Sequence, residues 1–305
     1  MGEWEKRIGE RGESVVSDFL DLIGWGDAQR NVSLPCLKKD KHKCKTHGID
    51  AFFSYQSNLV DRTLDHLVIS IKYTTKKYPA SPGSKFKEHF TDLAKAMECF
   101  RSSSVRKRAG QNFTSVNNAR NVGVLFWLTN DRDNRDVVSE VSTVRKIDDL
   151  SYENIFVVDD FRAAHIFDTV SWVKSYSDTH DFEFFYPNTG RNINPAFKES
   201  AGPVLPVEYV NSPVLPMVVK KNDGKKVFVI SSIDEFHVDR LRKLIGLAQN
   251  ITQDLSSETK ILFPDYDELF HENDVKDAKA GFEDKDFTAS VGVSCYRDDF
   301  RGGVA

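Results

Sequence analysis

The sequence predicts an α/β protein in which a mixed central sheet flanked by helices is followed by a smaller C-terminal α/β element. Short apolar runs typical of buried strands alternate with amphipathic, helix-compatible segments. At 305 residues the chain is long enough for one large domain or two. Its 40% hydrophobic and 29% charged residues are those of an ordinary globular protein, which excludes disorder throughout.

The first elements follow from periodicity. Apolar residues recur at helical spacing over residues 10–23 and Gly24 follows, which predicts a helix that ends there. Residues 48–53 form a short strand candidate after a lysine-rich loop. Residues 67–73 are a longer apolar run, typical of a buried strand.

Further elements complete the predicted N-terminal core. Residues 84–100 have an amphipathic helical pattern that Ser84 can cap. The compact apolar runs 122–128 and 155–158 suit central parallel strands. We therefore expect a first domain over residues 1–178.

The C-terminal part begins after a proline-rich stretch. Six of the ten prolines lie between Pro187 and Pro216, a density that breaks regular structure and predicts a connection over residues 179–216. A strand-helix-strand pattern follows. It predicts an accessory or interaction domain of α/β type over residues 217–305.

The charge is unevenly distributed. The formal net charge of the chain is −4, yet residues 31–120 carry 17 basic and 7 acidic side chains, a net +10, and residues 121–305 carry −11. Such a basic block predicts a phosphate-binding surface on an otherwise acidic protein.

The sequence also indicates where the protein works. The longest apolar run, residues 122–128, is far shorter than the ~20 residues that cross a bilayer. The N-terminus lacks a hydrophobic signal core, and four cysteines in a chain of this length do not form a disulfide scaffold. We therefore expect a cytoplasmic protein that does not interact with a membrane.

Two residues carry the clearest chemical signal. Asp50 ends a His-Gly-Ile-Asp turn, and Lys72 ends an apolar strand with Ser70 on the same face. The Lys72 ammonium can position an attacking water and stabilise negative charge on a phosphate. The Asp50 carboxylate can hold Mg²⁺, which prefers oxygen ligands, activates water and offsets phosphodiester charge. The pair therefore predicts metal-dependent phosphodiester hydrolysis.

These residues belong to an ordered set: a helix with Gly12 and Glu13, the turn 48–50, the strand end 70–72, an amphipathic helix and two further strands. This set resembles the PD-(D/E)xK nuclease superfamily, with a restriction-endonuclease-like core, and is most similar to its Holliday-junction-resolvase and Mrr-like branches. The resemblance covers residues 1 to about 175 and implies that Glu13 joins Asp50 at the metal site, with Lys72 as the motif lysine.

One position departs from the family pattern. Ser70 stands where a second acid is usual, so one metal-binding carboxylate is missing. The resemblance implies that the backbone carbonyl of Ile71 still coordinates the metal and that Glu13 compensates in part. Ser70 either takes part directly or is a small residue tolerated at the site. Weaker metal binding is expected, and loss of activity is the alternative.

Each candidate also has a purely structural interpretation. Asp50 can be an ordinary turn residue, and Lys72 can extend its charged end from a strand into water. Glu13, near the start of the predicted helix, stabilises the helix dipole whatever the function. Lysine runs are usually solvated surface, although here the basic residues bracket the proposed site in sequence. The candidate nucleic-acid-binding side chains are Lys43, Lys45, His47, Lys76, Lys77 and Lys87.

A second cluster offers a possible zinc site. Two cysteines and two histidines lie within the lysine-rich loop, with the spacing C-x5-H-x-C-x2-H, and zinc binds thiolates and imidazoles. The spacing matches no common finger pattern, so a solvated basic loop is the favoured alternative. The residues are Cys36, His42, Cys44 and His47.

Together these features predict a Mg²⁺- or Mn²⁺-dependent endonuclease that cuts DNA, and by analogy of fold an antiviral defence nuclease acting on foreign DNA. A protein partner or a homo-oligomer is expected, because an unrestrained nuclease damages its host. An inactive nuclease fold that binds nucleic acid or scaffolds a complex, and a nuclease that cuts RNA, stay open. The chain contains no Walker loop, dinucleotide glycine motif, HExxH or GxSxG, so ATP-driven and serine-hydrolase functions have no support.

Overall fold

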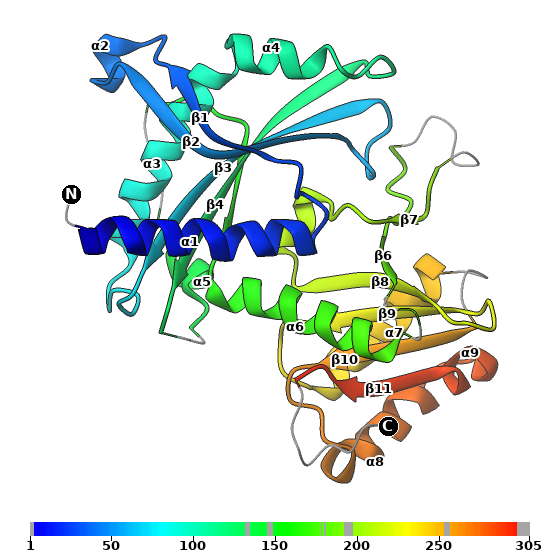
Figure 1. The fold of residues 1–305 in the computed structure, drawn as a ribbon. Coiled ribbons are helices and arrows are strands. Elements are labelled where there is room, and N and C mark those ends of the chain that lie inside the picture. Colours follow the sequence, from blue (N-terminus) through cyan, green and yellow to red (C-terminus); the bar gives the residue numbers. More distant parts are fainter. Residues whose placement is uncertain are drawn as a thin grey trace. The chain divides into compact units, whose positions relative to one another are not determined.

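The chain forms two compact units in the computed structural model (Figure 1). Unit 1 comprises Met1–Ala164 and Pro206–Asn211, and unit 2 comprises His165–Leu205 and Ser212–Ala305. The structure describes residues 3–131, 135–144, 149–177, 179, 181–191, 198–252 and 257–297.

Unit 1 contains a five-stranded mixed sheet with the order β1-β2-β3-β4-β5. The first three strands are antiparallel neighbours, whereas β3, β4 and β5 are parallel. The central stretches of the parallel strands β3 and β4, residues 67–69 and 122–128, are apolar and buried, as expected for strands covered on both faces. The strands are β1 (Gln29–Pro35), β2 (Thr46–Gln56), β3 (Thr63–Thr74), β4 (Asn118–Thr129) and β5 (Asn154–Val158).

Two helices cover opposite faces of this sheet. Helix α3 (Gly83–Phe100) packs on the face that carries Val68, whereas α1 (Glu3–Leu22) contacts β3 on the other face. The rings of Phe19 in α1 and Phe126 in β4 lie 5.8 Å apart, which marks the α1 face. Because successive side chains of a strand point to opposite faces, each residue of β3 can be assigned to the α3 face or to the α1 face.

Shorter helices complete unit 1, and a segment from beyond residue 200 returns to it. Glu208 of this segment accepts a 2.9 Å hydrogen bond from Arg120, whose guanidinium also binds the fully buried Asp65 at 2.6 and 2.7 Å. The elements are α2 (Lys39–His42), α4 (Ser104–Gly110), α5 (Val137–Val141) and the 3-10 helix η2 (Val207–Asn211), and α6 (Asp160–Tyr176) begins in unit 1 and ends in unit 2.

Unit 2 contains a six-stranded mixed sheet with the order β11-β10-β9-β8-β6-β7. The strands β9, β10 and β11 are parallel, and β8, β6 and β7 add antiparallel neighbours. Apolar side chains of α7 pack on this sheet. The elements are β6 (Phe182–Phe185), β7 (Ala201–Gly202), β8 (Val214–Lys220), β9 (Lys226–Ser232), α7 (Val238–Thr252), β10 (Glu258–Phe263), α8 (Glu268–Ala280), α9 (Lys285–Ala289) and β11 (Val291–Cys295).

The predicted α/β class is confirmed, with mixed sheets in both units and flanking helices. Two details differ from the sequence-based expectation. Helix α1 begins at Glu3, so Glu13 lies in its middle and not near its start. Helix α3 begins after Pro82, and Ser84 makes no capping bond to it. Among the described residues, no helix is both long and apolar enough to cross a bilayer.

The pairing of Arg120 with the fully buried Asp65 predicts a large effect on stability. Replacing Arg120 with alanine leaves the Asp65 carboxylate buried without its cation, so the free energy of unfolding should fall by about 3 kcal/mol. Denaturant unfolding followed by tryptophan fluorescence measures this. Arg242→Ala, which removes a 2.9 Å bond to the exposed Asp239, is the matched control and should change stability by less than about 0.5 kcal/mol. Equal effects of the two variants would contradict the prediction.

Candidate active site

The site lies where β2 and β3 separate. These strands are paired as far as Ala51 opposite Ile69. Beyond that point β2 stays paired with β1, and β3 continues along β4 to Thr74. Because neighbouring strands part here, polar groups at their ends are available for other interactions.

The Asp50 carboxylate joins the two strands at this point. Its Oδ2 accepts a 2.5 Å hydrogen bond from the backbone N–H of Ile71, in the stretch where the backbone pairing of β2 and β3 has ended. The bond fixes the carboxylate directly beside Lys72. A charge-assisted bond to a backbone amide holds a carboxylate more firmly than a neutral one would.

Strand alternation places the polar residues of β3 on the α3 face. Ser70 and Lys72 share the face of Val68, which packs in the core beneath α3. Ser70 is buried, with 8% of its surface exposed, whereas Lys72 is half-buried at the strand end. Lys72 is in register with Trp127 of β4.

Gly12 allows α1 to approach β3 closely. A Cβ at this position would lie 2.4 Å from the Cβ and 2.8 Å from the Cγ of Tyr73, distances that no pair of side chains adopts. Only glycine therefore fits where the helix crosses the end of β3. This close approach brings Glu13, the next residue, to the same end of the strand.

The side chains converge on one cavity of about 520 Å³. It combines two carboxylates with several cationic side chains and an aromatic wall. Its lining is Gly9, Glu13, Asp50, Ile71, Lys72, Tyr73, Thr74, Lys76, Lys77, Pro79, Lys85, His89 and Trp127.

Lysines give this cavity a positive rim. Lys76 and Lys77 follow β3, and Lys85 lies in the first turn of α3. Lys77 also forms an exposed 3.3 Å ion pair with Asp131, and Lys85 one of 2.9 Å with Glu88. Exposed pairs of this kind are weak and leave the ammonium groups available to an anionic ligand.

His89 and Trp127 form a wall that the sequence-based set did not include. Burial, and then the nearby ammonium groups of Lys72 and Lys85, lower the pKa of His89 to about 4, so its imidazole is uncharged at neutral pH. Its ring lies 5.7 Å from that of Trp127 in an edge-to-face arrangement. The available signal in the sequence was the i, i+4 spacing of Lys85 and His89 on one helix face.

Several other predicted residues lie elsewhere among the described parts of the chain. Ser70 is buried and is not among the lining residues, although the next residue, Ile71, is. His47 is buried and turned toward His42 and Cys44, and burial followed by His42 lowers its pKa. The exposed Lys43, Lys45 and Lys87 are not part of the lining.

The donor set fits a hard divalent cation. Glu13 and Asp50 bring carboxylate oxygens to the cavity, and Ile71 offers a backbone carbonyl at the same place. Mg²⁺ binds through one or two carboxylates and keeps several waters, for which an open cavity of this size has room. With Ser70 in the place of a second acid, the protein contributes few ligands.

Comparison with protein families identifies the class of the domain. Residues 1–162 match the family model described as "GAPS4 protein PD-(D/E)XK nuclease domain". The N-terminal part is thus a domain of the PD-(D/E)XK nuclease class, which confirms the resemblance found in the sequence. Searches of curated proteins and of solved structures give no match.

The family follows from the extent of this match, which covers more than half of the 305 residues. The chain belongs to the GAPS4 family, a family of antiphage defence proteins. Its nuclease domain implies a nucleic-acid substrate.

The tight crossing of α1 and β3 predicts opposite effects of two alanine substitutions in one helix. Gly12→Ala forces α1 away from Tyr73 and should lower the free energy of unfolding by about 1–3 kcal/mol. Gly9→Ala, whose Cβ would meet nothing within 4 Å, is the matched control and should raise it by up to about 1 kcal/mol through helix propensity. Denaturant unfolding of both variants gives the comparison, and a stabilising Gly12→Ala would contradict the close approach.

Proposed function

We propose that this protein is a divalent-metal-dependent endonuclease that hydrolyses DNA phosphodiester bonds in defence against foreign DNA. The observation that carries the proposal is the convergence of Glu13, Asp50 and Lys72 on one cavity within a PD-(D/E)XK domain. Carboxylates beside a lysine are the groups that metal-assisted phosphate hydrolysis needs.

Three side chains, those of Lys72, Asp50 and His89, have separate roles in the proposed reaction. The Lys72 ammonium hydrogen-bonds the attacking water and the scissile phosphate, and stabilises the charge that develops there. Asp50, fixed by the Ile71 amide, keeps its second oxygen, Oδ1, for the metal. The uncharged His89 adds a hydrogen-bonding group to the cavity wall without adding positive charge that would repel the cation.

Glu13, Asp50 and the Ile71 carbonyl would hold Mg²⁺ or Mn²⁺. A divalent cation bound there supplies Lewis-acid stabilisation of negative charge on the phosphate. The rim lysines Lys76, Lys77 and Lys85 would position the flanking phosphates, which makes binding dependent on salt.

DNA is the proposed substrate because the defence role of the family is directed against phage. RNA is the second candidate, since phosphate-binding lysines do not distinguish the two backbones. We further propose that the protein acts in the cytoplasm. The C-terminal domain that the sequence predicts over residues 217–305 would bind a protein partner or a second copy of the chain, which would restrain the nuclease. A catalytically inactive subunit is the competing function, since Ser70 removes one carboxylate.

Removing the Lys72 ammonium tests the mechanism. Lys72→Ala should slow the cutting of supercoiled plasmid in Mg²⁺ or Mn²⁺ by about 10²–10³-fold, because a charge that stabilises the transition state is lost. Plasmid nicking on agarose gels, with EDTA as the metal-free control and RNA in parallel, measures the rate and the substrate. Lys276→Ala in unit 2, which breaks an exposed pair with Glu272, is the control and should cut at the wild-type rate.

Cutting that survives Lys72→Ala would contradict the mechanism. Wild-type protein that binds DNA but cuts neither plasmid nor RNA in either metal, with candidate partners present, would favour the inactive subunit. Faster cutting of RNA than of plasmid would assign the RNA alternative.

Restoring the missing acid tests the metal site separately. Ser70→Asp adds a carboxylate beside Asp50 and should lower the Mg²⁺ concentration for half-maximal cutting by about tenfold, because affinity rises with ligand charge. Ser70→Asn has nearly the same size without the charge and is the matched control. A metal requirement equal in the two variants would argue against cation binding at this end of β3.

A further inference from the structure

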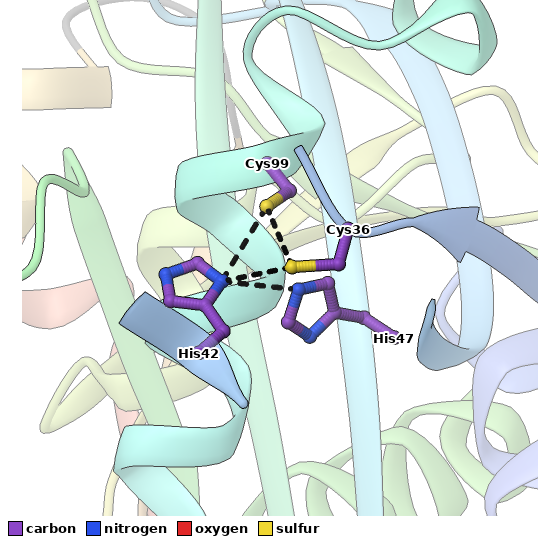
Figure 2. Close-up of side chains that lie close together, drawn as sticks. All are labelled: Cys36, His42, His47 and Cys99. Carbon is purple, nitrogen blue, oxygen red and sulfur yellow. Dashed lines mark hydrogen bonds between the residues drawn. The ribbon is translucent and has the colours of Figure 1, made fainter. Parts of the chain in front are cut away.

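A second group of metal-ligating side chains lies in unit 1, separate from the lining of the active-site cavity. It consists of Cys36, His42, His47 and Cys99, whose donor atoms all lie within 4.8 Å of one another (Figure 2). All four residues are buried, with between 0% and 8% of their surface exposed. They come from four places in the chain: the residue after β1, the end of α2, the start of β2 and the last turn of α3.

The distances from His42 Nδ1 to the other three ligand atoms, and the distance between the two sulfurs, are those of a tetrahedral zinc site. Zinc–sulfur and zinc–nitrogen bond lengths place two sulfurs about 3.8 Å apart, sulfur and nitrogen about 3.6 Å apart and two nitrogens about 3.3 Å apart. The two Sγ atoms are separated by 3.9 Å, and His42 Nδ1 lies 3.4 and 3.5 Å from them. His42 Nδ1 and His47 Nε2 are 3.2 Å apart. Each measured edge agrees with the expected one within about 0.2 Å.

Hydrogen bonding within the group does not account for this arrangement. His42 Nε2 lies 2.8 Å from a carboxylate oxygen of Glu98, which can only accept, so Nε2 carries a proton. The other ring nitrogen, Nδ1, lies 3.2–3.5 Å from the sulfurs of Cys36 and Cys99 and from His47 Nε2. Nδ1 offers a single proton or a single lone pair, so it cannot form a good hydrogen bond to each of the three, whereas a cation between the four atoms is ligated by all of them.

Glu98 has the features of a group that supports a metal ligand. Its carboxylate lies 2.8 Å from the Lys38 ammonium and 3.1 Å from the Lys41 ammonium, and it accepts a 3.1 Å hydrogen bond from the backbone N–H of Ser151. A carboxylate that accepts from the second nitrogen of a ligating histidine is a recurring arrangement at zinc sites, where it orients the ring and raises its basicity.

We propose that these four side chains bind one zinc ion in a closed structural site. Two thiolates and two imidazoles select zinc and disfavour Mg²⁺, which binds oxygen ligands. Because the protein supplies all four ligands, no position is left for a substrate, and the role is to hold the fold.

Such an ion would brace two elements of the active site. His47 lies three residues before Asp50 in β2, and Cys99 ends the helix whose first turns carry Lys85 and His89. The zinc would also hold the lysine-rich turn in one conformation, because Lys43 and Lys45 lie between the proposed ligands His42 and His47.

The proposed set replaces one residue of the cluster that the sequence indicated. Cys44 lies 3.7 Å from both ring nitrogens of His47, next to the group but outside the four converging atoms. Cys99 takes its place, although more than 50 residues separate it from His47 in the chain.

Metal content tests the proposal on the full chain. Protein purified without a metal-binding tag or chelator should contain about one zinc per chain by plasma mass spectrometry. Cys36→Ser and Cys99→Ser should each contain less than about a fifth of that amount. Two control variants should keep the wild-type zinc content. Cys295→Ser removes a free thiol in unit 2, and Cys44→Ser removes a thiol that lies next to the proposed ligands without being one of them.

Wild-type protein that contains no zinc, and takes up none from a chromogenic zinc chelator complex, would overturn the proposal, as would a disulfide between Cys36 and Cys99 in the freshly purified protein. Zinc retained by Cys99→Ser and lost by Cys44→Ser would overturn the assignment of Cys99.

Two measurements do not depend on whether the cysteine variants fold. Cobalt bound to the wild-type protein should give the intense visible absorption of a tetrahedral site with thiolate ligands, and weak octahedral absorption would contradict the geometry. Glu98→Gln should weaken zinc affinity by about tenfold, while Glu88→Gln, an exposed glutamate of the same helix, should not. Equal affinities in the two variants would contradict the supporting role of Glu98.

Discussion

The hydrogen bond from the Ile71 amide to the Asp50 carboxylate is the interaction on which the proposed active site depends. It forms where β2 and β3 have stopped pairing, so it replaces a backbone contact and fixes the acid of one strand beside Lys72 of the next. The separation of the strands opens the cavity at the same point. If β2 and β3 remained paired by backbone hydrogen bonds at this point, the Asp50 carboxylate would not be held by the Ile71 amide and there would be no space for a phosphate.

A second constraint comes from the opposite face of the sheet. Helix α1 can supply Glu13 only because Gly12 lets it cross β3 in contact with Tyr73. The site is poor in carboxylates, since Ser70 stands in the usual place of an acid, and rich in lysines along its rim. Such a balance favours a polyanionic ligand. In the proposed active site, the low number of carboxylates would make metal affinity the property most sensitive to substitution.

Local patterns allowed part of this structure to be predicted. The spacing from Asp50 to Lys72 and the apolar runs indicated the sheet of a nuclease domain, because alternation and length are visible in the sequence itself. The edge strand β1 is largely exposed and gave no such signal, and Pro216 concealed β8, in which it lies. Cys99 could not be found, since only the packing of α3 brings it to its group, and the one signal for His89 was its i, i+4 spacing from Lys85. Most of the predicted basic surface stays a prediction, with only Lys76 and Lys77 of that set at the cavity.

The central claim is that Glu13 and Asp50 hold a divalent cation beside Lys72. Anomalous diffraction from crystals soaked in Mn²⁺ tests it most directly, because the signal locates the ion without reference to catalysis. The account predicts one peak within coordination distance, about 2.2 Å, of the Asp50 and Glu13 carboxylates, which is lost in Asp50→Asn crystals. Crystals that bind Mn²⁺ only elsewhere, with the two carboxylates pointing away from each other, would contradict it.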